Sequence, residues 1–280
     1  MSLSIFTNAS SMASTNAMNK SNSMLSTAME RLGTGKRINS AADDAAGLQI
    51  ATRLQGQTNG MTVAQRNISD ATAMLQTAEG AFDEVNNIMY RMKDLATQAS
   101  NDTNSAKDRE ALQSEMTELN SELKNIMSNT KYAGDNLFEG ANAKLGGTLN
   151  FQIGASTGEQ LQVNVSGNLK AVSDSLTTLS NGTVDSFANA QTMITNLESA
   201  IEGVGTLRST LGANINRLGH TAANLANMKD NTDLALGNIQ DADYATEAST
   251  MSRNQLLAQT SMSMLKQSNS MSSMVMSLLG

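Results

Sequence analysis

The sequence predicts a mainly α-helical protein in which long antiparallel helices form a coiled-coil-like rod with one β-hairpin. Three observations lead to this fold class. Alanines and apolar residues recur every three or four positions over long stretches, which is typical of helices packed lengthwise on one another. Proline, a frequent break between elements, is absent from the 280 residues. Aromatic residues make up 3% of the chain while methionine occurs 19 times, so the predicted core is aliphatic and adaptable.

The first two long helices follow from two apolar seams joined by the short polar stretch "ASNDTNS". Because this connection is short, the two helices are expected to be antiparallel. The second helix begins with a predicted capping box, in which Ser105 accepts from a backbone amide and Asp108 reaches back. The seams consist of Met61, Ala64, Ile68, Ala71, Leu75, Ala78, Phe82, Val85, Met89, Met92 and Ala96, and then of Leu112, Met116, Leu119, Leu123 and Ile126.

The middle of the chain changes to a period of two, which predicts a β-hairpin at about 147–166. Residues 166–183 are rich in Ser, Thr, Asn and Gly, and they are expected to form a surface connection. The alternating apolar positions of the hairpin are Leu149, Phe151 and Ile153, followed by Leu161, Val163 and Val165.

A third seam predicts one long helix that returns along the first two. Arg208 is the single break in this seam, and it is expected to extend to the edge or to pair with a carboxylate on a facing helix. The seam consists of Phe187, Ala190, Ile194, Leu197, Ile201, Val204, Arg208, Leu211, Ile215, Leu218, Ala222 and Leu225.

Both ends of the chain carry apolar residues at seven-residue spacing, flanked mostly by Ser, Asn, Thr, Ala and Met. Helices of this composition are marginal in water by themselves, so they are expected to pair with each other or with other copies. A repeated contact between copies that does not close on itself produces a helical filament. The predicted assembly residues are Met18, Leu25 and Leu32 at one end and Leu257, Met264, Met271 and Leu278 at the other.

The charge and the apolar pattern exclude several functional classes. A net charge of −7 argues against a basic nucleic-acid surface. Apolar runs are too short to cross a bilayer, so no membrane insertion is expected. The start "MSLSIFTNASSMASTN" lacks the basic and apolar regions of a secretory signal, which leaves export without a cleaved signal. With no cysteine there is no disulfide framework.

Candidate catalytic groups are few, and the sequence predicts a protein that is not an enzyme. The lone histidine, His220, is interpreted as a helix-surface or interface residue, since no nucleophile motif accompanies it. No cofactor or metal is expected, because the chain lacks cysteine and any paired histidines. Asp43 and Asp44 could serve acid–base chemistry, but no assisting base or metal ligand is evident. They are interpreted, with Arg37 and Arg53, as a polar capping and inter-subunit cluster.

Two long motifs resemble the ends of bacterial flagellin, the subunit of the flagellar filament. They are "MERLGTGKRINSAADDAAGLQIATRL" at 29–54 and "DADYATEASTMSRNQLLAQTSMSMLKQSNSM" at 241–271. The stretch at 60–100 and "NTKYAGDNLF" at 129–138 are similar to the same family. The "MSLSI" start and short length resemble a lateral-type flagellin that lacks large outer domains.

The resemblance implies a division of the chain into inner and outer parts of a filament. It assigns 1–40 to an N-terminal inner-core helix and connecting spoke, and 41–180 to the N-terminal part of an outer core. It assigns 181–235 to the C-terminal part of the outer core and 236–280 to a C-terminal inner-core helix. The implied function is polymerisation into an extracellular filament for swimming or swarming. The alternative within the same lineage is a hook–filament junction protein.

The resemblance also implies partners. These are identical subunits, a flagellin export chaperone, the filament cap and hook-junction proteins, with export of the unfolded chain through the flagellar type III apparatus. Some flagellins are detected by Toll-like receptor 5, and the residues that match that pattern here are Arg91, Leu95 and Glu115. Lys93 and Asp94 depart from the pattern, and lysine does not replace arginine at a bidentate contact.

Overall fold

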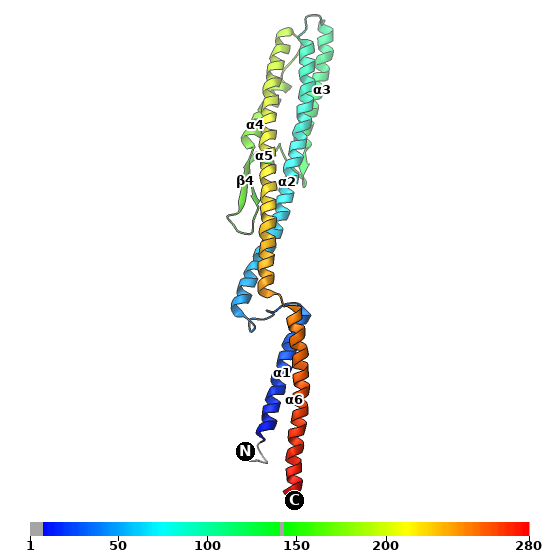
Figure 1. The fold of residues 1–280 in the computed structure, drawn as a ribbon. Coiled ribbons are helices and arrows are strands. Elements are labelled where there is room, and N and C mark those ends of the chain that lie inside the picture. Colours follow the sequence, from blue (N-terminus) through cyan, green and yellow to red (C-terminus); the bar gives the residue numbers. More distant parts are fainter. Residues whose placement is uncertain (1–7, 141–142, 280) are drawn as a thin grey trace. The chain divides into compact units, whose positions relative to one another are not determined.

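The computed structural model describes residues 8–140 and 143–279, and it divides into two compact units (Figure 1). Unit 1 takes Met1–Gln57 and Asn231–Gly280, and unit 2 takes Thr58–Asp230. The predicted mainly α-helical fold is confirmed. The elements are α1 (Ala9–Thr34), α2 (Ala45–Ala99), α3 (Ala106–Asn129), β1 (Lys131–Tyr132), β2 (Asp135–Asn136), η1 (Lys144–Gly146), β3 (Thr148–Gln152), β4 (Gln160–Asn164), α4 (Ser166–Ser180), α5 (Phe187–Gln240) and α6 (Tyr244–Leu279).

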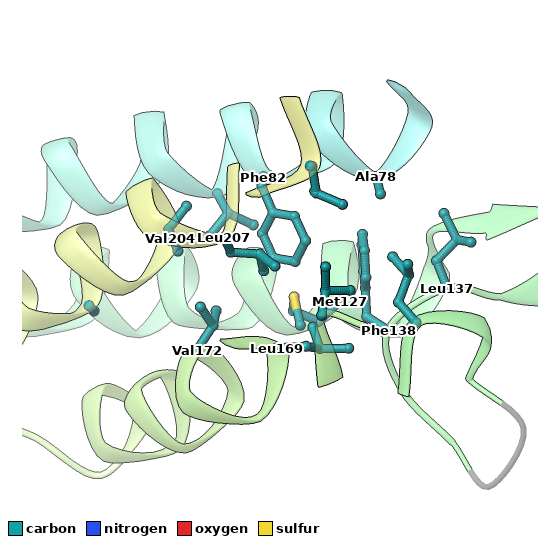
Figure 2. Close-up of a cluster of buried hydrophobic side chains, with 14 of the residues drawn as sticks. Ala78, Phe82, Met127, Leu137, Phe138, Leu169, Val172, Val204 and Leu207 are labelled. Atoms are coloured by element: carbon teal, nitrogen blue, oxygen red, sulfur yellow. The ribbon is translucent and has the colours of Figure 1, made fainter. Parts of the chain in front are cut away.

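Unit 2 has a continuous apolar core made by α2, α3 and α5, as the seams predicted. Every member of the predicted seam from Met61 to Ala96 is buried. On α5 the buried set includes Leu197, Val204 and Leu211, which the third seam also contains. Phe82 stands at the centre, with its ring centroid 4.6 Å from that of Phe138. Figure 2 shows side chains from α2, α3, α4 and α5 meeting around this pair.

Polar contacts fix the ends of the helices in unit 2. The predicted capping box is present: Ser105 accepts from the Asp108 amide, and the Asp108 carboxylate accepts from the Ser105 amide. Arg109 then donates to the carbonyls of Ala99 and Asn101, which holds the turn between α2 and α3. Arg208, the predicted break in the α5 seam, pairs with Glu79 at 2.6 Å and with Asp83 at 2.9 Å on α2. The hydrogen bond with Glu79 raises the pKa of this guanidinium.

The predicted hairpin is the antiparallel pair β3–β4, in which Leu149 faces Val163 and Phe151 faces Leu161. A second pair, β1–β2, was not predicted. It has two residues in each strand and turns through Ala133 and Gly134, both at positive φ. So short a pair contains no alternating apolar run, and the sequence pattern therefore could not reveal it.

The expectation of a surface connection at 166–183 was wrong, because most of this segment forms α4. Leu169, Val172 and Leu179 are buried on the face that α4 turns to the core. These residues and the partly buried Leu176 follow the three-and-four spacing of an amphipathic helix. Serine and threonine between them are weak helix formers, and this composition hid the apolar period. Tertiary burial outweighs their low propensity here.

Candidate assembly surface

In unit 1, α1 and α6 lie antiparallel against each other (Figure 1). Near one end of the pair, Asn8 donates to the Ser268 hydroxyl at 2.8 Å and Ser11 donates to Asn269 at 3.2 Å. Near the other end, Arg31 pairs with Glu247 at 3.0 Å. The identified cross-helix polar contacts therefore lie toward both ends, and the long middle part depends on packing.

The seam between α1 and α6 is built mainly from small residues. The most buried positions of α1 are Ser14, Ser21 and Ala28, at seven-residue spacing. Among the side chains of α6 that the structure describes, Asn254 and Ser261 are buried, again seven apart. Asn254 and Ser14 donate to carbonyls four residues earlier in their own helices, so these groups are satisfied without bonding across the seam. Burial of small polar residues removes little apolar area from water, and the seam is consequently weak.

The large apolar residues predicted for assembly fall into two sets. Met18, Leu25 and Leu32 are half-buried beside the small residues of the α1–α6 seam. On α6, Leu257, Met264 and Met271 are 47%, 59% and 57% exposed. We call these three residues the apolar stripe. Leu257 and Met264 each precede a half-buried position by one residue, which turns them about 100° around the helix from the seam. The side chain of Leu278 lies outside the described part.

Additional large aliphatic side chains of α1 and α6 are exposed. They are Met12, Met24 and Met29 on α1 and Leu256, Met262 and Met274 on α6. Sequence reasoning did not single them out, since none belongs to the heptads it followed. The most buried positions of α1 and α6 thus carry serine, alanine and asparagine, while several methionines and leucines of the same helices are exposed. An exposed apolar surface of this kind marks a site of association.

A short antiparallel bridge joins the segment that follows α1 to the segment between α5 and α6 in unit 1. The Arg37 amide donates to the Gln240 carbonyl at 2.7 Å, and the Ala242 amide donates to the Gly35 carbonyl at 2.9 Å. Gly35 ends α1 in the left-handed conformation, with φ 73°. Ile38 is fully buried beside Gly47, where a β-carbon would lie 2.7 Å from the Ile38 Cδ1 atom. Only glycine allows this close approach without displacement.

The residues of the predicted polar cluster act separately within one chain. Asp43 accepts from the backbone amides of Ser40 and Asn39, and these bonds lower the pKa of its carboxyl. Asp44 accepts from the Gly47 amide at 2.8 Å in the first turn of α2. Arg37 donates to the Ile239 carbonyl at 2.7 Å, and Arg53 is exposed. Among the described residues, no ion pair joins the two arginines to the two aspartates.

The candidate receptor residues lie in unit 2. Arg91 on α2 donates through both Nε and a terminal nitrogen to Glu115 on α3, at 2.9 and 2.7 Å. Both side chains are about half exposed. Leu95 is 1% exposed, so it supports the α2 core and offers no surface in this conformation.

Other candidate chemistry is limited to isolated groups. His220 is exposed on α5. Within 8–140 and 143–279, no three or more histidines, cysteines and carboxylates come together in a way that could hold a metal ion. Within these same ranges no helix has the length and hydropathy needed to traverse a bilayer. Asp243 lies just before α6 and accepts from the Ala245 and Thr246 amides, and its hydrogen bonds with Thr246 lower the pKa of its carboxyl.

Known proteins with similar sequences identify the family of this chain. Residues 5–143 match the bacterial flagellin N-terminal helical region, and residues 194–279 match the bacterial flagellin C-terminal helical region. A flagellin of Halalkalibacterium halodurans is 38% identical over 253 residues, which cover 90% of each chain. The chain belongs to the bacterial flagellin family. A flagellin is a structural protein of the extracellular flagellar filament, as the sequence predicted.

Solved structures of flagellar proteins resemble the structure of this flagellin. The crystal structure of a Bacillus cereus flagellin is 31% identical, with a TM-score of 0.50, and the match covers 57% of this chain and 88% of that one. A Vibrio parahaemolyticus protein described as flagellar hook-associated has a TM-score of 0.58 at 15% identity, over 71% of this chain and 100% of that one. At that identity the second likeness concerns the fold alone.

Proposed function

We propose that this flagellin polymerises when copies of the same chain cover the apolar stripe and the exposed methionines of unit 1. One observation carries the proposal. The most buried positions of the terminal helices carry serine, alanine and asparagine, while most of their methionines and two leucines of α6 are exposed. A partner that covers a leucine or methionine side chain contributes about 1.5–3 kcal/mol for each one buried. The small intrachain seam supplies much less, so neighbouring subunits stabilise the terminal helices.

The polar cluster is proposed to bind neighbouring copies as well. Asp43 and Asp44 are committed to backbone amides of their own chain, but each carboxylate retains further lone pairs. Arg53 is exposed on α2 and carries a fixed charge. Contacts between Arg53 and an aspartate of the next subunit would fix the register of two copies, whereas the apolar stripe supplies most of the affinity.

Further roles follow from family membership. The flagellin is proposed to leave the cell unfolded through the flagellar type III apparatus, and to meet an export chaperone, the filament cap and hook-junction proteins. Recognition by Toll-like receptor 5 would use Arg91 and Glu115, whose side chains reach solvent. Catalysis has no place in this function. The alternative of a hook–filament junction protein is supported by the shared fold, while the matched flagellin regions favour the filament.

The test removes the apolar stripe from the full-length chain. The substitutions Leu257→Ser, Met264→Ser and Met271→Ser are combined, and polymerisation is followed by sedimentation and electron microscopy. Loss of three buried apolar side chains is expected to raise the critical concentration by at least about a hundredfold. Circular dichroism should show that helix content is retained, because these side chains are exposed in the single chain.

A matched control places the same number of serines on the opposite side of α6. Gln255→Ser, Gln259→Ser and Lys266→Ser replace exposed residues that lie roughly half a turn from the stripe. This variant should form filaments at the critical concentration of the unsubstituted chain. Normal polymerisation of the stripe variant would refute the proposed assembly surface.

A further inference from the structure

The methionines of this chain separate into two populations by exposure. Those of unit 2 are buried, at 6% exposure or less, apart from Met228. Those of unit 1 include seven between 45% and 61% exposed, while Met18 and Met251 are half-buried in the α1–α6 pair. The buried population is Met61, Met74, Met89, Met92, Met116, Met127 and Met193. The exposed population of unit 1, among the side chains that the structure describes, is Met12, Met24, Met29, Met262, Met264, Met271 and Met274.

We propose that the exposed methionines of unit 1 are a site of reversible oxidation, at which hydrogen peroxide blocks addition of the subunit to the filament. This inference rests on the assembly surface proposed above. In the reaction, the thioether sulfur attacks one peroxide oxygen and the O–O bond breaks. A sulfoxide and water form, sulfur loses two electrons and peroxide gains two. Dithiol-dependent sulfoxide reductases reverse the change, with formation of a disulfide and water.

The exposure of each sulfur decides which methionines react. Peroxide must reach the thioether, and the core of unit 2 leaves its seven buried methionines almost no accessible surface. The flexible side chains of Met12, Met264 and Met271 are more than half exposed on helix surfaces. Met228, which is 43% exposed on α5, should also react, and it provides a modified position outside unit 1.

The sulfoxide acts on assembly and leaves the folded chain intact. In a single subunit the new oxygen faces water, where it is hydrated. In a contact between copies the same oxygen is buried against apolar side chains that offer no hydrogen-bond donor. Burial of a polar group without a hydrogen bond is unfavourable. Once the contact has formed, neighbouring copies shield the sulfurs. The methionines are therefore sensitive to peroxide only before the subunit joins the filament.

The experiment compares peroxide-treated and untreated full-length subunits, with peptide mapping to locate the added oxygens. The exposed positions should be oxidised while the buried positions of unit 2 remain thioethers. Treatment should raise the critical concentration at least about tenfold, since one unpaired buried polar group has an effect of that order. Incubation with reductases for both sulfoxide epimers should restore it, and far-ultraviolet circular dichroism should be unchanged. Filaments formed before treatment should persist.

Two variants separate the site from general damage. Replacing all seven exposed methionines of unit 1 by leucine keeps apolar volume, so this chain should polymerise equally well before and after treatment. Met228→Leu should remain as sensitive as the original chain. If the seven-leucine chain does not fold, recovery of polymerisation after reductase treatment of the unsubstituted chain tests the proposal instead.

Several outcomes would overturn the inference. These are normal polymerisation of the oxidised subunit, equal oxidation of buried and exposed positions, loss of helix on treatment, or no recovery with the reductases. Failure of the untreated chain to polymerise would be a different result, because it would refute the proposed function itself.

Discussion

Units 1 and 2 use the same helical period and place opposite kinds of residue inside. In unit 2 the buried positions carry phenylalanine, leucine and methionine, and the core is closed within the chain. In unit 1 the most buried positions of α1 and α6 carry serine, alanine and asparagine, while leucines and methionines are half-buried or exposed. Periodicity decides which residues face a neighbouring helix, and the size of those residues decides whether one neighbour buries enough apolar surface to stabilise the pair. Unit 2 is complete in one chain, whereas unit 1 gains most from further copies.

The largest expected effect comes from opening the core of unit 2. Phe82→Ala removes a fully buried ring and should lower the free energy of unfolding of unit 2 by about 3–5 kcal/mol. Hydrogen exchange resolved along the chain should show faster exchange within 58–230 than in the unsubstituted protein. The matched change in unit 1, Ser261→Ala, should alter stability by no more than about 0.5 kcal/mol. Equal effects of the two substitutions would contradict the contrast between the two units.

A smaller effect is expected at the bridge of unit 1. A β-carbon on Gly47 would lie 2.5 Å from an Asp44 carboxylate oxygen, in addition to its close approach to Ile38. Gly47→Ala should therefore destabilise unit 1 by about 1–3 kcal/mol through overpacking. Thermal unfolding followed by circular dichroism measures the change.

Gly33 provides the control for this substitution. A β-carbon there would meet nothing within 4 Å. Gly33→Ala should stabilise α1 by about 0.5–1 kcal/mol, because alanine restricts the unfolded chain. If Gly47→Ala were equally stabilising, the close packing assigned to the bridge would be wrong.

The smallest expected effect concerns the capping box of α3. Hydrogen bonds with Ser105 hold the pKa of the Asp108 carboxyl below its ordinary value of 3.8. A lowered pKa in the folded chain means that this stabilisation is present above pH 3.8 and disappears as the pH falls through the folded value. Asp108→Asn should slightly destabilise unit 2 at pH 7 and have a smaller effect as the pH falls below 3.8, as measured by urea unfolding.

The control for the capping box is another acid on the same helix. Glu118→Gln changes one exposed carboxylate outside the box and should have little effect at either pH. A difference between Asp108→Asn and the original chain that persisted unchanged into strong acid would show that the carboxylate charge does not matter.

Much of the fold could be predicted because long seams leave a strong pattern. The helices around Phe82 and Leu211, the Ser105–Asp108 capping box and the partner class of Arg208 all follow from spacing and residue type. Segment α4 was missed because its four apolar positions lie among serines and threonines, and composition was given more weight than period. The β1–β2 turn was missed because two residues per strand contain no period.

The assembly surface was harder to predict, for a physical reason. A seven-residue repeat has the same appearance whether it faces a helix of the same chain or of another copy. Met18 and Leu25 proved to lie beside an intrachain seam, while Leu257 and Met264 are exposed. The small seam residues could have been located four positions before each large one on α1, since Ser14 precedes Met18 and Ser21 precedes Leu25. Which surface remains open depends on the packed structure.

The pairing of α1 with α6 also sets an order of events for a newly delivered chain. Asn8 and Ser268, joined by a hydrogen bond, are 260 residues apart in the sequence. Closing so large a loop is slow compared with forming the local contacts between α2 and α3. Unit 2 can thus mature first, and the surface that recruits the next copy is finished last. Until α1 and α6 have paired, the surface proposed for assembly is incomplete.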